Sequence, residues 1–197
     1  MDNSHQPCPL IVIITGPPGT GKTWLSGRLT HDLGLPGLRR DDLKELLFNT
    51  LGIHDRAWSR QLGGASYELL FHMLALLLKT GQACLVESNF YGEIAIGKLC
   101  ALVQQYRYRP FQIQCRTTPT VLLERLQQRV ISGERHPGHA DHEDINTITL
   151  ANVLGKYDPL PLDGAYLEMD TTDFATVEYD ALLAQITVEL ERQRKWP

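Results

Sequence analysis

Residues 16 to 23 read Gly16-Pro17-Pro18-Gly19-Thr20-Gly21-Lys22-Thr23, a complete G-x-x-x-x-G-K-[ST] phosphate-binding loop. An apolar run at residues 10–14 comes before it, and a helical pattern of leucines follows it. Strand, glycine-rich turn and helix are the context that this motif requires. The glycines let backbone N–H groups surround phosphate oxygens, and the helix N-terminus adds the positive end of its dipole. The stretch therefore predicts a nucleoside triphosphate site.

The polar residues of this loop have expected roles when a nucleotide is bound. Lys22 should contact the β- and γ-phosphates, and the Thr23 hydroxyl should bind Mg²⁺. A nucleoside triphosphate and Mg²⁺ are thus expected at this site. The residues expected to contact the nucleotide are the motif and the residue after it: Gly16, Pro17, Pro18, Gly19, Thr20, Gly21, Lys22, Thr23 and Trp24.

The composition is that of an ordinary globular protein. The chain has 197 residues, of which 43% are hydrophobic, and a formal net charge of −4. We interpret residues 1–197 as one domain. The acidic balance makes nucleic acid a less favoured partner, because proteins that bind it usually carry a basic surface. No feature of the sequence determines the oligomeric state.

Cysteine usage and hydropathy indicate a cytoplasmic protein. The four cysteines show no C-x-x-C spacing, and Cys84 and Cys115 lie in apolar runs where buried thiols are expected. The N-terminus is polar, unlike a signal peptide. The longest apolar stretch, residues 69–78, is interrupted by His72 and is too short to cross a bilayer. We expect a buried helix there and no membrane association.

Apolar runs of strand length alternate with helical patterns along the chain. This alternation predicts an α/β fold, a parallel sheet with helices on both faces. Strands are expected at residues 10–15, 35–39, 83–87, 111–115 and 165–169, and helices at 22–33, 41–48, 65–79, 93–106, 119–131, 144–154 and 177–190. Residues 53–61 are polar and are interpreted as a short helix or a loop. Ligands of such sheets bind at the carboxyl ends of the strands.

Two carboxylates follow the second expected strand. A kinase with a phosphate-binding loop needs an acid there to orient and deprotonate an acceptor hydroxyl. Asp41 and Asp42 both occupy this position, and either one also suits the start of the next helix. We predict Asp41 as the catalytic base, with Asp42 as the alternative. Lys44, one helical turn on, is a candidate contact for the acceptor or a phosphate.

A third acid ends the third expected strand. Glu87 is followed closely by Asn89, where side chains reach the same edge of the sheet as the phosphate-binding loop. We expect Glu87 to hold Mg²⁺ through its water shell or to bind a substrate hydroxyl, with Asn89 as a further substrate contact. Asp170 competes for this role but is interpreted as starting the last turn.

Three arginines cluster after the fourth strand. Arg125 and Arg129 are spaced i, i+4 on a helix, and Arg135 follows in a turn-rich loop. Mobile cations that close over a triphosphate stabilise the charge that develops during transfer. We therefore predict a lid at about residues 125–145, with Arg129 as a catalytic residue. His136 and His139, with His142, do not have the spacing of a familiar zinc site.

The sequence resembles the small P-loop kinases related to zeta toxins, chloramphenicol phosphotransferase, gluconate kinase and polynucleotide 5′-kinase. The resemblance extends over most of the chain and is strongest to a bacterial group described as AAA-type or zeta-toxin-like ATP-binding proteins. Four segments carry it: the loop at 16–23, Arg40-Asp41-Asp42-Leu43-Lys44, Val86-Glu87-Ser88-Asn89-Phe90, and Arg125, Arg129 and Arg135 with the loop at 133–139.

This resemblance implies details that the residues alone do not. It implies ATP as the nucleotide, a five-stranded sheet of order 2-3-1-4-5, and a helical insert at about residues 42–80 that shapes the acceptor pocket. It also implies Asp41 as the general base and phosphate contacts from Arg125, Arg129 and Arg135. Polynucleotide kinases usually carry arginine at the position of Lys44, so the resemblance leaves an acceptor phosphate contact there open.

Three functions fit these features. The first is a Mg²⁺-dependent kinase that transfers the γ-phosphoryl group of ATP to a hydroxyl of a small molecule. The second is a 5′-hydroxyl polynucleotide kinase, which uses the same chemistry but needs a basic acceptor groove. The third is a nucleotide-dependent switch or toxin-like ATP-binding protein. A carboxylate at Asp41 favours an enzyme over an inert binder.

Overall fold

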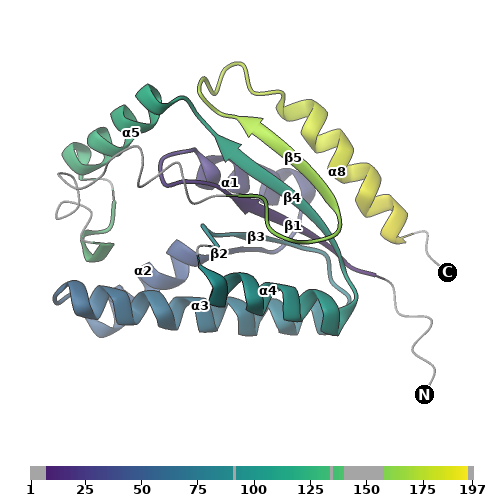
Figure 1. Cartoon of the computed structure of the whole chain (residues 1–197), viewed down its shortest axis with the longest axis horizontal. Coiled ribbons are helices and arrows are strands. Elements are labelled where there is room, and N and C mark those ends of the chain that lie inside the picture. The colour runs from purple at the N-terminus through teal and green to yellow at the C-terminus, as the bar shows by residue number, and fades with distance from the viewer. Residues whose placement is uncertain (1–7, 91, 134, 140–157, 195–197) are drawn as a thin grey trace.

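A parallel sheet of five strands, in the order β2-β3-β1-β4-β5, lies at the centre of the molecule (Figure 1). The computed structural model describes residues 8–90, 92–133, 135–139 and 158–194. The strands are β1 (Leu10–Thr15), β2 (Gly37–Arg39), β3 (Cys84–Glu87), β4 (Arg109–Arg116) and β5 (Ala165–Asp170). The helices are α1 (Lys22–Leu33), α2 (Arg40–Leu51), α3 (Arg56–Lys79), α4 (Glu93–Tyr106), α5 (Pro119–Ser132) and α8 (Tyr179–Arg194), with a short 3₁₀ turn, η1 (Pro137–His139). The predicted α/β class and strand order are confirmed.

Two hydrophobic cores lie on opposite faces of the sheet, and the central strand β1 contributes to both. Ile11 and Ile13 pack in one core with residues of α3 and α4. Val12 and Ile14 pack in the other with residues of α1 and α8. Because both faces are covered, every residue of β1 is buried, which explains why its sequence is a continuous apolar run. The buried Cys84 and Cys115 confirm the expected thiols.

The register of the strands brings the predicted polar residues to one edge of the sheet. Ile14, at the end of β1, pairs with Glu87 at the end of β3. Glu87 also pairs with Arg39, the last residue of β2, after which α2 begins at once. Parallel strands end at the same edge, so the phosphate-binding loop, Glu87 and the start of α2 meet there.

Helix α3 begins earlier than its sequence pattern predicts. It starts at Arg56 rather than at residue 65, so residues 56–61 belong to it and do not form a separate element. The Asp55 side chain caps it by accepting a hydrogen bond from the Trp58 backbone N–H at 2.8 Å. Between residues 56 and 62 only Ser59 and Leu62 are buried. Because so few of these residues face the core, this part of the helix has no apolar pattern that would have predicted it. The helix expected at 144–154 lies outside the described residues.

By length and composition alone, α3 could cross a membrane. The helix has 24 residues and is longer than the apolar stretch at 69–78, which by itself is too short to cross a bilayer. In the fold, Leu70, Leu74 and Leu78 are buried in the core beside the sheet, and α3 also contacts α2 and α4. Packing on the sheet and the adjacent helices therefore accounts for this side of α3, whereas Leu69, Met73 and Leu76 of the same helix are exposed.

Candidate active site

The phosphate-binding loop connects β1 to α1 in a conformation that its glycine and threonine residues impose. Gly16 has a φ of 139°, and a Cβ there would lie 2.4 Å from the Cys115 carbonyl oxygen, so only glycine fits. Thr20 Oγ1 donates a hydrogen bond to the Pro17 carbonyl oxygen at 2.7 Å. Thr171 Oγ1, after β5, donates to the Thr20 carbonyl oxygen at 2.7 Å. The loop is thus held by a hydrogen bond between two of its own residues and by a second one from the residue that follows β5.

Lys22 is a buried cation at the centre of this loop. It is 7% exposed, and its Nζ donates a hydrogen bond to the Pro17 carbonyl oxygen at 2.9 Å. Burial lowers the pKa of its ammonium group, while the negative charges of Glu87 and Asp41 act in the opposite direction. A cation that has lost its hydration is stabilised by an anionic partner. The terminal phosphates of a nucleotide have the charge that this position requires.

Thr23 and Glu87 present oxygen atoms side by side at the start of α1. Thr23 Oγ1 donates a hydrogen bond to Glu87 Oε2 at 3.3 Å. Burial raises the pKa of the Glu87 carboxyl, although the nearby Lys22 lowers it in part. Mg²⁺ is usually bound through one or two protein oxygens together with phosphates and water, so this pair fits it. The described residues contain no group of three or more His, Cys, Asp and Glu suited to a metal ion.

One cavity of about 220 Å³ joins most of the predicted site residues, and we call it the phosphate cavity. It lies among the phosphate-binding loop, the start of α2, the end of β3 and the segment around α5. Its lining residues are Pro18, Gly19, Gly21, Lys22, Thr23, Arg40, Asp41, Lys44, Glu87, Asn89, Arg129, Arg135 and His139. Four elements that are far apart in the sequence therefore meet at one anionic-ligand site.

The two candidate carboxylates of α2 have different surroundings. Asp41 lines the phosphate cavity, and its Oδ2 accepts a hydrogen bond from Arg135 Nη2 at 3.3 Å. Burial by itself would raise the pKa of Asp41, but the charge of Arg135 and other nearby cations holds it below its ordinary value. Asp42 forms an ion pair with Arg39 at 2.7 Å, has a half-exposed side chain and does not line the cavity. Only Asp41 is placed to face a substrate at this cavity.

The three predicted lid arginines are not equivalent. Arg129 and Arg135 line the phosphate cavity. Arg125 does not: its Nη2 donates to the Thr171 carbonyl oxygen at 2.8 Å, its Nη1 donates to the Gly19 carbonyl oxygen of the phosphate-binding loop at 3.4 Å, and its guanidinium lies over the Phe174 ring at 4.3 Å. In this arrangement Arg125 therefore lies beside the loop, bound by carbonyl groups, without lining the cavity. Its contact with the nucleotide stays a prediction.

Trp24 is likewise directed away from the phosphate cavity. Its ring centroid lies 4.7 Å from that of Phe174 and 6.4 Å from that of Tyr179, and Arg28 lies over both Trp24 and Tyr179. The side chain thus packs against the segment that follows β5. A nucleotide contact by Trp24 remains a prediction.

His139 connects the segment after α5 to helix α2. Arg135 Nη2 is 3.2 Å from His139 Nδ1, and His139 Nε2 is 3.0 Å from Glu45 Oε1. An arginine can only donate, so Nδ1 must accept and the proton must be on Nε2, which donates to Glu45. Burial, reinforced by the charge of Arg135, lowers the pKa of His139 to about 3. His139 is therefore a neutral link that orients Arg135 beside Asp41.

The segment at 135–139 packs directly on helices α2 and α3. The His136 ring stacks on Phe48 with centroids 5.3 Å apart. Ser59 Oγ, on α3, donates to the Gly138 carbonyl oxygen at 2.8 Å and accepts from Lys44 Nζ at 3.0 Å. The histidines of this segment, to which the sequence gave no role, thus hold Arg135 against α2 and α3. His142 lies outside the described residues.

Gly138→Ala should displace this segment. An added Cβ would lie 2.5–2.6 Å from three atoms of the Phe48 ring, which is itself buried and cannot move aside easily. Because misplacing a charged group by about 1 Å can reduce a rate by roughly 10²-fold, we expect transfer to fall roughly 10- to 100-fold with little change in melting temperature. Steady-state transfer and thermal unfolding measure the two effects. Gly97→Ala, in an open position of α4, is the control, and an equal loss there would contradict this interpretation.

Arg40, like His139, lines the cavity although the sequence did not single it out as a site residue. It lines the phosphate cavity next to Asp41, and its Nη1 lies 4.0 Å from Asp41 Oδ1. Its spacing could have indicated a place in the site, because Arg40 precedes Lys44 by four residues and so lies on the same face of the helix. Arg40 is far from the phosphate-binding loop in the sequence, so this spacing did not indicate that both would line one cavity.

Comparisons with known proteins agree with this geometry. A family model described as an AAA domain matches residues 11–160. No curated protein matches the chain significantly. A crystal structure of a candidate kinase from Chloroflexus aurantiacus is 37% identical, with 91% of this chain and 97% of that chain covered and a TM-score of 0.80.

More distant structures share the fold alone. The APS kinase of Mycobacterium tuberculosis, solved with AMPPNP and APS, is 18% identical over 94% of this chain and 99% of its own, with a TM-score of 0.58. A gluconokinase from Sinorhizobium meliloti is 14% identical over 96% and 98%, with a TM-score of 0.53. The fold is thus that of P-loop kinases, and together with the phosphate cavity it supports a phosphotransferase in general. The chain belongs to the AAA-domain family whose model spans its residues 11–160.

Proposed function

We propose that this protein is a kinase that transfers the γ-phosphoryl group of ATP to a hydroxyl group of a small molecule. The observation that carries the proposal is the position of Asp41, which lines the same cavity as Lys22, Thr23, Arg129 and Arg135. A carboxylate facing a phosphate-binding loop is what phosphoryl transfer to a hydroxyl requires. Asp41 is present in addition to Glu87, the carboxylate beside Thr23 that is placed to hold Mg²⁺, and this second acid favours transfer to a hydroxyl over nucleotide binding alone.

Each residue has a role in this reaction. Lys22 and the backbone of the loop bind the phosphates, and Thr23 and Glu87 would hold Mg²⁺, which neutralises charge on the triphosphate. The acceptor oxygen bonds to the γ-phosphorus while the bond from that phosphorus to the β–γ bridging oxygen breaks. The hydroxyl proton passes to an Asp41 carboxylate oxygen, and the departing electron pair stays with ADP. Arg129 and Arg135 stabilise the charge on the transferring group.

The location and partners follow from the same proposal. We propose a cytoplasmic location, with which the four free cysteines are compatible. Asn89 lines the phosphate cavity beside Glu87 and is proposed to contact the substrate, as is Lys44. We propose ATP as the phosphoryl donor and a small molecule with a hydroxyl group as the acceptor.

Arg129→Ala should slow transfer more than it weakens nucleotide binding. The guanidinium acts mainly on charge that develops on the transferring phosphoryl group, so its loss should lower kcat by about 10²-fold while the Kd for ATP changes a few-fold. Calorimetric titration of ATP and single-turnover transfer separate the two quantities. The reverse pattern, a weak Kd with an intact kcat, would make Arg129 a simple binding residue.

The transfer reaction itself is tested with γ-labelled ATP, Mg²⁺ and a panel of acceptors. The panel contains small alcohols, sugars, nucleosides, antibiotics and a 5′-hydroxyl oligonucleotide, with the Asp41→Asn variant as control. Label that moves to a small molecule, and fails to move in the variant, supports the proposed kinase. Label on the oligonucleotide alone, or release of free phosphate alone, would contradict it.

A further inference from the structure

A second cavity, of about 350 Å³, adjoins the phosphate cavity, and we call it the basic cavity. The two cavities share Arg40, Lys44 and His139. The rest of the basic cavity is lined by residues of α3 alone: Arg56, Ser59, Arg60, Gly63, Gly64 and Tyr67. Its volume falls within the range of small-molecule sites. A ligand bound here would lie next to Asp41 at the boundary of the two cavities.

The basic cavity concentrates positive charge in a protein whose formal net charge is −4. Arg40 and Lys44 come from α2 and Arg56 and Arg60 from α3, each pair at i, i+4, so each helix turns two cations to one face. None of the described residues that line the cavity is acidic. His139 also lines the cavity, but its lowered pKa of about 3 leaves the imidazole neutral. The electrostatic field in this cavity therefore favours an anion.

Two of these cations are largely buried. Lys44 is 8% exposed, and the Arg40 side chain is 18% exposed. The Arg40 guanidinium lies 4.3 Å from the centre of the Tyr67 ring, and its Nε is buried without a hydrogen-bond partner in the described part of the chain. Burying a guanidinium with an unused donor is unfavourable unless an acceptor completes it. An anion in the basic cavity would offset the charge of this largely buried guanidinium.

Two consecutive glycines in the middle of α3 keep this space open. A Cβ at Gly63 would lie 3.2 Å from Arg40 Nη2, so glycine lets the guanidinium lie against the helix. A Cβ at Gly64 would have no neighbour within 4 Å and would point into open space. Glycine is a poor residue for a helix interior, so a pair of them is better explained by the cavity than by the helix.

We propose that the basic cavity selects an acceptor that carries an anionic oxygen group: a phosphate, a sulfate or a carboxylate. The inference rests on the kinase function proposed above and names the class of its acceptor. Arg56, Arg60 and Arg40 bind the anionic group, and the acceptor extends past Lys44 so that its hydroxyl reaches Asp41. Neutral alcohols lack the group that these cations bind and are poor substrates.

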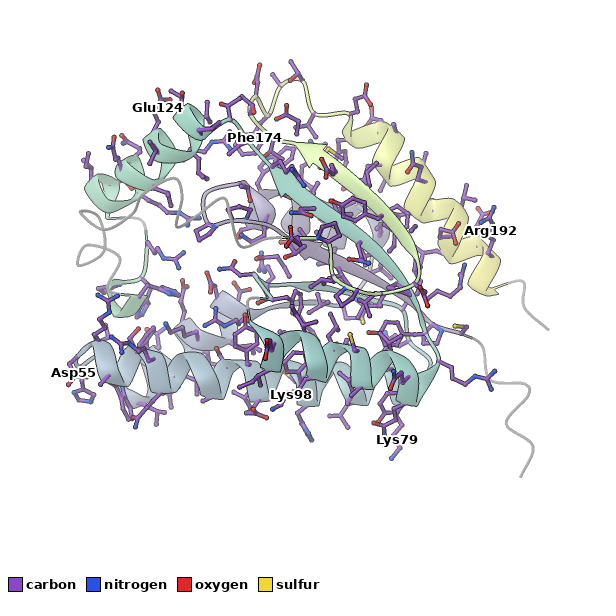
Figure 2. The ribbon with its side chains drawn as sticks, viewed as in Figure 1. Asp55, Lys79, Lys98, Glu124, Phe174 and Arg192 are labelled. Atoms are coloured by element: carbon purple, nitrogen blue, oxygen red, sulfur yellow. The ribbon has the colours of Figure 1, made fainter. Side chains whose placement is uncertain are left out.

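Anion binding is tested separately from turnover. The full chain is saturated with AMPPNP and Mg²⁺, so that the phosphate cavity is occupied, and the binding of radiolabelled sulfate is measured by equilibrium dialysis at constant ionic strength. We expect one saturable site, with affinity reduced about tenfold or more in the double variant Arg56→Gln, Arg60→Gln. Lys79→Gln, at the opposite end of α3 from Asp55, is the matched control and should bind like wild type (Figure 2). Absence of a saturable site overturns the proposal.

Selectivity is tested with matched acceptor pairs that differ in one group, such as glycerol and glycerol 3-phosphate, ribose and ribose 5-phosphate, and glycerol and glycerate. We expect the anionic member to be the better acceptor by at least about tenfold in kcat/KM. The double variant should raise the KM for that acceptor with kcat and the Kd for ATP near wild type. A preference for neutral acceptors, or for a 5′-hydroxyl oligonucleotide over every small anion, would overturn the inference. Saturable sulfate binding without transfer to any acceptor would contradict the kinase function and leave anion binding intact.

Gly64→Ala examines the shape of the basic cavity without removing charge. The added methyl group enters open space, so we expect a raised KM for the anionic acceptor with an unchanged or higher melting temperature. Gly97→Ala, at an equally open position in α4, should raise the melting temperature without changing the KM. Equal KM values for the two variants would show that no acceptor occupies the space above Gly64.

Discussion

Lys22→Ala should reduce phosphoryl transfer by on the order of 10³-fold and remove productive triphosphate binding. Lys22 is 7% exposed, and its Nζ donates a hydrogen bond to the Pro17 carbonyl oxygen inside the loop at 2.9 Å. No other cation of the phosphate-binding loop can replace it, since the remaining residues of the motif carry no charge. Transfer from γ-labelled ATP and calorimetric titration of ATP measure the two effects.

A second lysine variant tests whether the effect depends on the position of Lys22 or only on the loss of one positive charge from the protein. Lys98 is on α4, and its ammonium group pairs with Glu68 at the surface. Lys98→Ala removes the same group from the protein and should leave transfer and nucleotide affinity unchanged. Thermal unfolding of both variants shows whether each is folded. Transfer by a folded Lys22→Ala within a few-fold of wild type would exclude the proposed role of the loop.

Asp41→Asn should lower transfer by a factor on the order of 10² to 10⁴ while the Kd for ATP stays near that of wild type. The amide has nearly the size of the carboxylate but cannot take the acceptor proton. The lowered pKa of Asp41 keeps the carboxylate ionised at neutral pH, so wild type has a base available and the variant has none. Single-turnover transfer at saturating ATP isolates this step.

Asp42→Asn is the matched control for this experiment. The two residues are adjacent, but Asp42 pairs with Arg39 and does not line the phosphate cavity. We therefore expect its variant to transfer at a rate close to wild type. A loss confined to Asp42→Asn would move the catalytic role to Asp42, and full activity in both variants would remove a base on α2 from the mechanism.

The sequence predicted best those elements whose conformation is determined by residues close together in the chain. The strand before the phosphate-binding loop, the loop and α1 were all correctly placed, because β1 is buried on both faces and the chain must turn at Gly16. The strand order followed from family resemblance and was confirmed. The start of α3 was missed because few residues between 56 and 62 are buried and one cap, Asp55, decides where the helix begins.

The side chains of the candidate site were harder to place than the elements that carry them. The sequence favoured Asp41 and kept Asp42 as the alternative, and in the structure Arg135 contacts Asp41 while Arg39 pairs with Asp42. Arg125 and Arg129 share a helix, yet the carbonyl oxygen of Thr171 binds only the first of them in the contacts described. In each case the deciding partner is a residue whose position depends on how distant segments pack.

The sequence by itself determined that the chain has a phosphate-binding loop motif and an alternating α/β fold. These properties follow from local sterics, from backbone N–H groups and from the burial of apolar runs, all of which act between residues close in the chain. Only the tertiary structure decided that the segment at 135–139 packs on α2 and α3, and that Arg40, Lys44, Arg56 and Arg60 surround one cavity. Such contacts join residues up to 94 positions apart, as between Asp41 and Arg135, and they exist only because the two helices and the loop pack together at the edge of the sheet.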